Sequence, residues 1–261
     1  KALLQRVQAA YNALLRAAAR RMVRARDLPG MPLSFSAPPG TWVSFREGVL
    51  YDLNLRKLAD FDTLLHHEGD QRLTTHPARR AVRIPGHADR DTIFLKAHLV
   101  VHPKDRLRSV LSLGRAPTPA MREWLMLHAF AGHGIAAPFP LGIAEHRPWG
   151  VPAASLLLLA PLPRRAQRLD LFLDRRVRRN EPETWACIAS VLAKMHRAGL
   201  QHADLYAKHV FLECLEAVLP DVYLEAHLVD LQRAREVRRM TPARRARDLA
   251  ALRATVPHAV L

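Results

Sequence analysis

The sequence contains little cysteine and no long hydrophobic run, and each shortage excludes a class of protein. Cys187 and Cys214 are the two cysteines among 261 residues, and their spacing matches neither a zinc motif nor a disulfide framework. This usage fits a reducing compartment. The longest charge-free apolar run, Val151 to Pro163, is interrupted by three prolines and falls short of the roughly 20 residues that span a bilayer. We therefore expect neither metal-thiolate chemistry nor a transmembrane helix.

Acidic side chains are also scarce, and the charge balance is strongly basic. The chain has 40 Lys and Arg against 24 Asp and Glu, a formal net charge of +16. Such an excess attracts nucleic acid, anionic lipid or phosphorylated substrates. The arginine-heavy stretch Arg164 to Arg179 is predicted either to face a phosphate-bearing substrate or to form a solvated helix face. No helix-turn-helix, zinc finger or aromatic RNA-binding motif occurs, so we expect no specific nucleic-acid partner.

The first 40 residues differ from the rest in pattern. Between Leu3 and Met22, apolar residues recur at helical spacing with arginines at other positions. This pattern predicts a long amphipathic helix, which either packs on the protein, the reading we favour, or lies on an anionic membrane. The proline-containing segment Leu28 to Gly40 predicts a linker. We expect residues 1–40 to form this helix and linker.

Strand signals dominate the first part of the remaining chain, and helix signals the second. Antiparallel β-structure is predicted from the runs Trp42–Phe45, Ala81–Ile84 and Thr92–Val101, and a fully buried strand from Leu156–Leu159. Helices are predicted from the cap Thr118 to Phe130, and from Pro182 to Ala198 before Gly199. Short runs at Val210–Leu212 and His227–Val229 predict a hairpin. The fold class is therefore α+β.

Three charged residues stand where phosphoryl-transfer chemistry needs them. Lys96 is the one lysine in an apolar run, and is predicted either at a sheet edge or aimed at an anion. Asp204 precedes a short strand, on a loop carried by packed elements, where catalytic residues are common. Asp230 directly follows Leu228-Val229, at a strand end where a carboxylate can hold a metal. The alternative for both aspartates is a turn-capping role.

The segment His202-Ala203-Asp204-Leu205, followed by His209, resembles the catalytic loop of protein-kinase-like enzymes. Most of that superfamily has Asn at the later position. With histidine at this position, the segment resembles the catalytic loop of the bacterial lipopolysaccharide core kinases. This is the family of Kdo and heptose kinases of WaaP/InaA type. The segment Leu228 to Arg233 resembles that family's Asp-apolar-x-Arg motif. Phe94-Leu95-Lys96 resembles the superfamily's strand lysine, and the likeness covers roughly Phe61 to Leu252.

The resemblance implies a nucleotide site that uses ATP and Mg²⁺. Lys96 would neutralise the nucleotide phosphates, and Glu123 would orient it through an ion pair rather than form a surface salt bridge. Asp230 would bind Mg²⁺. For His209 three roles stay open, because magnesium prefers oxygen to imidazole: a weak ligand, a ligand that favours Mn²⁺, or a hydrogen-bonding residue.

The resemblance also implies the catalytic roles and the substrate. Asp204 would accept the proton of a sugar hydroxyl, and His202 would brace the loop rather than carry a proton. The implied activity is an ATP-dependent kinase for heptose or Kdo of the lipopolysaccharide inner core. We expect a cytoplasmic protein, peripheral on the anionic inner membrane. The alternatives are a small-molecule kinase of aminoglycoside or choline type, or a catalytically silent kinase-like scaffold.

The implied architecture is a protein-kinase-like fold of two lobes, with departures from the usual pattern. The sheet-rich lobe would span residues 41–160, and the helical lobe residues 161–261 in shortened form. No G-x-G-x-x-G motif is present, and Gly69 is the one glycine near the expected phosphate cover. No glycine lies two residues after Asp230, so activation-loop switching is not expected. The sequence indicates neither the exact sugar nor the oligomeric state.

Overall fold

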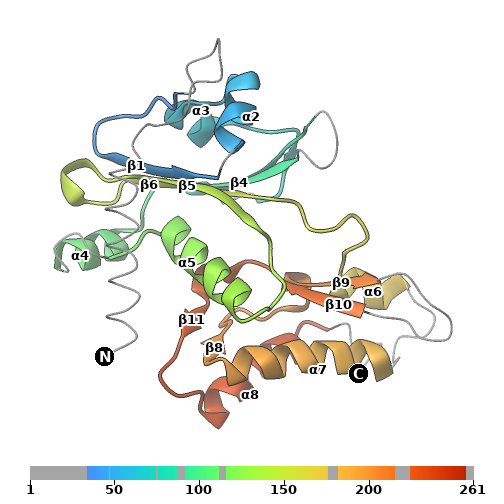
Figure 1. The fold of residues 1–261 in the computed structure, drawn as a ribbon. Coiled ribbons are helices and arrows are strands. Elements are labelled where there is room, and N and C mark those ends of the chain that lie inside the picture. The colour runs from blue at the N-terminus through green and yellow to red at the C-terminus, as the bar shows by residue number, and fades with distance from the viewer. Residues whose placement is uncertain are drawn as a thin grey trace.

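The computed structural model describes residues 34–256, except 47, 75, 87–91, 112–115, 176–181 and 215–223. The amphipathic helix predicted near the N-terminus lies outside the described residues. An antiparallel sheet forms the upper half of the molecule in Figure 1 and a mostly helical part the lower half. The sheet order is β1 (Thr41–Phe45), β5 (Pro140–His146), β6 (Ala154–Leu159), β4 (Ile93–His98), β3 (Arg79–Ile84) and β2 (Gln71–Arg72).

Both faces of this sheet are covered, and strand β4 shows the consequence. Ile93, Leu95 and Ala97 belong to the apolar core on one face of the sheet. Because side chains alternate along a strand, Phe94, Lys96 and His98 point to the opposite face. In β6, alternate leucines belong to the two different cores, which explains why this strand is apolar at every position. The alternation therefore places Lys96 on the face that looks toward the helical part.

Two short helices over the upper face were not predicted. They are α2 (Val49–Leu55) and α3 (Phe61–His66), and they cover the sheet in Figure 1. The Asp60 side chain caps α3 by accepting a hydrogen bond of 2.7 Å from the Thr63 backbone N–H. Each helix is only six or seven residues long. A helical period cannot be recognised over so few residues, and β-prone runs lie nearby in the sequence. The two helices were therefore not predicted.

The helices in the other part of the molecule are α4 (Pro103–Leu111), α5 (Pro119–Gly132), α6 (Leu169–Arg175), α7 (Pro182–Arg197) and α8 (Pro242–Arg253), and the short 3₁₀ turns are η2 (Pro148–Gly150), η3 (Ala207–His209) and η4 (Leu231–Arg233). Of these helices, α5 and α7 were predicted from the sequence, whereas α4, α6 and α8 were not. Thr118 caps α5 as predicted, accepting from the Met121 N–H at 3.2 Å. Helix α5 lies between the large sheet and the lower helices (Figure 1). None of the described helices is long and apolar enough to cross a bilayer.

Two small sheets complete the helical part. Strands β10 (Leu224–Leu228), β9 (Val210–Cys214) and β7 (Gln167–Arg168) form one, and β11 (Arg235–Glu236) with β8 (Leu200–Gln201) forms the other. The antiparallel pair β9 and β10 is the hairpin predicted from the sequence, with Leu212 opposite Ala226. His209 stands immediately before β9, and Asp230 follows two residues after β10. The hairpin therefore holds both residues at the same end.

We predict that Gly142→Ala destabilises the large sheet. Gly142 of β5 lies directly opposite Phe45 of β1, and a Cβ at this position would overlap the Phe45 ring. Overpacking of this kind costs about 1–3 kcal/mol of unfolding free energy. Gly132→Ala is the matched control, because a Cβ there meets no atom within 4 Å at the end of α5. Urea unfolding of both variants measures the difference, and equal stabilities would contradict the packing argument.

Candidate active site

The ammonium group of Lys96 joins the sheet to two carboxylates from other elements. Its Nζ donates to Glu123 Oε1 of α5 at 2.6 Å and to Asp230 Oδ1 at 3.4 Å. The side chain of Glu123 is only 1% exposed, so this pair is not a surface salt bridge. Desolvation lowers the pKa of Lys96, but Glu123 and Asp230 outweigh it and hold the pKa above its usual value. Lys96 is therefore a fixed positive charge.

Asp230 adopts a backbone conformation that few side chains accept. Its φ is 59° and its ψ 58°, in the left-handed region. The turn aims the carboxylate at Lys96 and at His209, whose Nε2 lies 3.5 Å from Asp230 Oδ2. Desolvation acts to raise the pKa of Asp230, but Lys96 and His209 lower it below its usual value. The aspartate is therefore ionised and strained, which is common at functional sites.

The hydrogen bonds of His209 determine which ring nitrogen presents a lone pair. Nδ1 of His209 lies 2.8 Å from the carbonyl oxygen of Asp204, and a carbonyl only accepts, so Nδ1 carries the proton. In the neutral ring, Nε2 then directs its lone pair toward the carboxylate of Asp230. Two electron-pair donors that face each other, one of them a histidine fixed through its other nitrogen, fit a shared divalent cation. The residues therefore fit the metal that the sequence implied.

Asp204 lies on the loop between β8 and β9, beside an arginine that follows Asp230. Arg233 Nη1 donates to both carboxylate oxygens of Asp204, at 3.0 Å and 3.3 Å. The Asp204 side chain is 17% exposed, whereas that of Arg233 is 70% exposed. The carboxylate is thus accessible from solvent, as a group that receives a proton from a substrate must be. Sequence reasoning named Arg233 within its motif but gave it no role.

A buried aspartate from α8 holds the loop that carries Asp204. Asp248 is 1% exposed and accepts from the backbone N–H of His202 at 3.2 Å and of Ala203 at 3.0 Å. It also accepts from His196 Nε2 of α7 at 3.0 Å. Ala203 has a φ of 68°, a left-handed conformation that these bonds maintain. Sequence reasoning missed Asp248, because no local pattern shows that a helix carboxylate pairs with a loop some 45 residues earlier.

His202 occupies the bracing position that the sequence predicted for it. Its Nε2 donates to the carbonyl oxygen of Val229 at 3.0 Å, and its ring stacks on that of His209 with centroids 6.1 Å apart. The side chain is fully buried, and desolvation, followed by the neighbouring His209, lowers the pKa of His202. A neutral, buried ring links the loop to the strand end before Asp230. This geometry is that of a structural residue.

A cavity of about 790 Å³ lies on the same face of the sheet as Lys96. Phe94 of β4 lines it and stands two residues before Lys96, so both side chains share one face. The remaining lining residues come from β3, from the approach to β4 and from the segment after β6: Arg83, Thr92, Pro161, Leu162, Pro163 and Arg164. An apolar floor with basic residues at its edge suits a planar base that carries phosphates.

The turn between β2 and β3 stands where kinase-like enzymes carry a glycine-rich phosphate cover. The sequence over 73–78 contains no glycine. Gly69 lies instead before β2, with a φ of 63°, and an added Cβ would overlap the carbonyl oxygen of Arg83. Glycine is therefore required at position 69, where the backbone packs closely against Arg83. The sequence-based expectation of a cover poor in glycine agrees with this placement.

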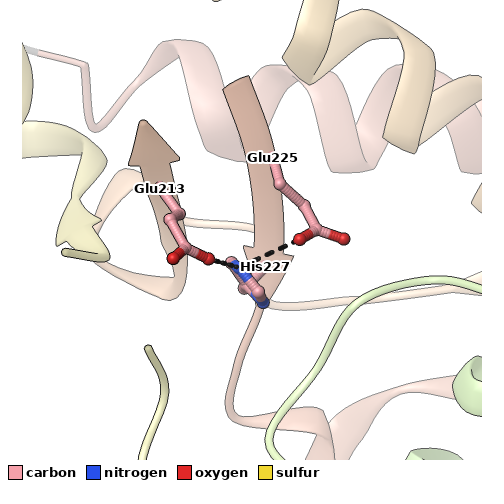
Figure 2. A group of neighbouring side chains, drawn as sticks. All are labelled: Glu213, Glu225 and His227. Atoms are coloured by element: carbon pink, nitrogen blue, oxygen red, sulfur yellow. Dashed lines mark hydrogen bonds and ion pairs between the residues drawn. The ribbon is translucent and has the colours of Figure 1, made fainter. Parts of the chain in front are cut away.

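Outside this site, the β9–β10 hairpin carries a second charged group, shown in Figure 2. Glu213 and Glu225 lie directly opposite each other, and His227 lies on the same face two residues after Glu225. His227 Nε2 is 3.3 Å from Glu213 Oε2 and 3.8 Å from Glu225 Oε2. Like charges directly opposite destabilise a strand pair, so the histidine compensates a repulsion. The group stabilises the hairpin that positions His209 and Asp230.

The two glutamates of this group give a matched pair of variants. Glu213 is 15% exposed and hydrogen-bonded to His227, so Glu213→Gln is expected to lower the unfolding free energy by about 1–2 kcal/mol. Glu225 is 49% exposed and more distant, so Glu225→Gln is expected to change it by less than about 0.5 kcal/mol. Urea unfolding at neutral pH measures both. Equal losses would show that burial does not distinguish the two contacts.

His98 predicts a pH dependence of stability in the strand that carries Lys96. Desolvation, followed by the charge of Lys96, lowers the pKa of His98 to about 3. In the unfolded chain, His98 binds a proton near its ordinary pKa of about 6.5. In the folded protein the ring stays neutral until the pH is much lower. The stability contributed by the neutral ring is complete above pH 6.5 and is lost as the pH falls toward 3. In this window the unfolding free energy should fall by up to about 1.4 kcal/mol per pH unit from this group.

His98→Leu should remove that contribution, because no titratable group then occupies the buried position. Urea unfolding of both proteins at several values between pH 4 and pH 7 measures the two slopes. The wild type should lose stability on acidification more steeply than the variant. Parallel curves would contradict the assignment.

Comparisons with known proteins identify the family. The model of the lipopolysaccharide kinase (Kdo/WaaP) family matches residues 71–257. The chain is 30% identical over 166 residues to the lipopolysaccharide core heptose(I) kinase WaaP of Escherichia coli (strain K12). That match covers 61% of this chain and 61% of the relative, so the chain spans about three fifths of that protein's length.

A solved structure shows the fold. A structure of WaaP in complex with acyl carrier protein is similar with a TM-score of 0.59 and 23% identity, over 82% of this chain and 80% of that one. A Rio2 kinase structure from Chaetomium thermophilum is similar with a TM-score of 0.49 and 12% identity, over 78% of this chain and 56% of that one. The predicted α+β, protein-kinase-like fold is confirmed. The chain belongs to the lipopolysaccharide kinase (Kdo/WaaP) family.

Proposed function

We propose that this chain transfers the γ-phosphoryl group of ATP to a sugar hydroxyl, on heptose or Kdo, of the lipopolysaccharide core. The observation that carries the proposal is the meeting of Lys96 with Glu123 and Asp230, at 2.6 Å and 3.4 Å, in a member of this family. A fixed cation beside an ionised carboxylate is what a nucleotide with its metal requires.

The nucleotide side of the site uses five residues. The base occupies the cavity over Phe94, and the Lys96 ammonium neutralises the phosphates while Glu123 fixes its position. Asp230 and His209 would hold a divalent cation, since Asp230 Oδ2 and His209 Nε2 lie 3.5 Å apart. Mg²⁺ serves this role, and the imidazole ligand makes Mn²⁺ an effective substitute. The cation supplies charge neutralisation on the nucleotide phosphates when bound.

The acceptor side uses the loop that Asp248 holds. Asp204 accepts the proton of the sugar hydroxyl while the hydroxyl oxygen forms a bond to the γ-phosphorus of ATP. The bond between the γ-phosphorus and the bridging oxygen breaks, and that oxygen leaves with ADP. His202 and Asp248 act only on the position of Asp204, through the loop backbone. Such positioning matters because a general base works only within hydrogen-bond distance of its proton donor.

The substrate class and the site of action follow from the family and the charge. The similar Escherichia coli protein is named a lipopolysaccharide core heptose(I) kinase. The net charge of +16 favours an anionic acceptor and a peripheral position on the cytoplasmic face of the anionic inner membrane. We assign residues 41–160 and 161–261 to two lobes, with nucleotide bound by the first and catalysis on the second.

The test is phosphoryl transfer from labelled ATP to core oligosaccharide, with Mg²⁺ or Mn²⁺. Asp204→Asn should lower kcat by about 10²–10⁴-fold and leave nucleotide affinity unchanged, because it removes only the proton acceptor. Asp230→Asn should abolish turnover and weaken metal-dependent nucleotide binding by at least about tenfold, because it removes a charged ligand. Titration calorimetry measures the binding.

Asp62→Asn is the control, since Asp62 is an exposed aspartate of α3. It removes the same charge as the two site variants and should retain full activity. Nucleotide binding without transfer to any core sugar by the wild-type chain would contradict the proposed catalysis. That result would favour a kinase-like scaffold.

A further inference from the structure

The contact between Arg233 and Asp204 is the starting point for an inference about the acceptor. Both carboxylate oxygens of Asp204 accept from one nitrogen, Nη1 of Arg233, at 3.0 Å and 3.3 Å. Among the described residues, Asp204 is the one hydrogen-bond partner of this guanidinium that the structure shows. The side chain proposed to receive the acceptor's proton is therefore hydrogen-bonded to a cation.

The backbone of Arg233 is fixed, whereas its side chain is free to exchange partners. Leu231, at the start of η4, is fully buried, and the Ala234 N–H closes the turn on its carbonyl at 3.0 Å. The Arg233 side chain is 70% exposed, and ion pairs so open to water are weak. A second anion that arrives beside Asp204 can therefore take the guanidinium from it.

The contact leaves most of the guanidinium's bonding capacity unused. A guanidinium has five N–H groups in a planar fork that matches carboxylate and phosphate oxygens two at a time. Asp204 is bound here through a single nitrogen, in a geometry that is not bidentate. The side chain is 70% exposed, so its remaining N–H groups are open to an incoming ligand beside Asp204. This arrangement suits the capture of an anionic group on the acceptor.

We propose that Arg233 recognises an anionic group of the acceptor, a phosphate monoester or a carboxylate close to the reacting hydroxyl, and exchanges Asp204 for that group. The inference rests on the proposed kinase function and adds the acceptor chemistry that the site selects. When the anion takes the guanidinium, the Asp204 oxygens become available to the hydroxyl. When the acceptor lacks the anionic group, Arg233 stays hydrogen-bonded to Asp204. Arg233 thus couples substrate identity to the availability of the proton acceptor.

A hollow beside the same loop offers room for the rest of such an acceptor. Its volume is about 310 Å³, and it is lined by Asp170, Tyr206, Lys208 and Thr255. Tyr206 follows Asp204 by two residues, and its backbone N–H donates to the Asp204 carbonyl at 2.9 Å. The exposed Lys208 extends the positive surface away from Arg233. The hollow thus offers an oligosaccharide one basic side chain, two hydroxyl groups and the carboxylate of Asp170, which is paired with Arg168.

The experiment compares four preparations of one core oligosaccharide: native, dephosphorylated, carboxyl-amidated, and treated in both ways. Wild-type protein and Arg233→Gln are assayed with each, and kcat and KM are separated. For the native acceptor, Arg233→Gln should raise KM at least about tenfold. For the acceptor that lacks both anions, KM of the two proteins should agree within about twofold. The singly treated preparations identify whether phosphate or carboxylate is the recognised group.

Two further variants separate recognition from positioning. Arg233→Lys keeps the charge without the fork and should restore KM only in part. Arg238→Gln, which removes an exposed arginine of the same segment, should leave both constants unchanged. An equal loss of kcat with every acceptor, at unchanged KM, would overturn the proposal, because Arg233 would then only position Asp204.

Binding without ATP keeps this test separate from that of the kinase function. Titration calorimetry with the native oligosaccharide should show at least about tenfold weaker binding to Arg233→Gln than to the wild type. This result would support the acceptor site even if no phosphoryl transfer occurred. Equal binding by the two proteins would overturn the inference even if the chain is an active kinase.

Discussion

One ammonium group joins the two halves of this protein. Lys96 stands on the sheet, whereas its partners Glu123 and Asp230 come from a helix below the sheet and from the end of a hairpin far along the chain. A buried charge is tolerated only when it is paired, so the three groups must come together as the chain folds. The position of α5 beneath the sheet, with Glu123 directed upward, follows from that requirement.

Around this charge, the protein maintains two strained positions. Ala203 and Asp230 both have positive φ without being glycine. Each such residue costs of order 1–3 kcal/mol and persists only when its surroundings compensate. For Ala203 the compensation is the buried carboxylate of Asp248, and for Asp230 it is the paired charge of Lys96. Two of the four described non-glycine residues with positive φ therefore lie in the candidate catalytic segments; the other two, Lys57 and Trp149, lie elsewhere.

The sequence predicted the parts of the molecule whose signals are local. The apolar run of β6, the capped helix α5 and the hairpin of β9 and β10 each have a period or a cap that neighbouring residues supply. The meeting of Lys96, Glu123 and Asp230 was expected through family resemblance, not through any local pattern. The short helices α2 and α3 were missed because two turns are too few to establish a period.

Contacts that depend on distant segments could not be predicted in the same way. Asp248 serves a loop some 45 residues earlier in the chain, and the sequence carries no sign of that pairing. The ion pair between Arg233 and Asp204 depends on the direction of the turn after Asp230, and that direction is a property of the whole fold. The lining of the 790 Å³ cavity likewise combines three separate segments. Such features arise from topology, since no local pattern encodes which segments meet.

The burial of Leu231 limits how far Asp230 can turn away from Lys96. Its side chain is fully buried directly after Asp230, and no glycine follows to relax the backbone. Turning Asp230 out of the site would expose a leucine to water, at a cost of about 2 kcal/mol. Protein kinases that switch by this movement have a flexible residue there. The burial of Leu231 therefore favours the orientation in which Asp230 faces Lys96.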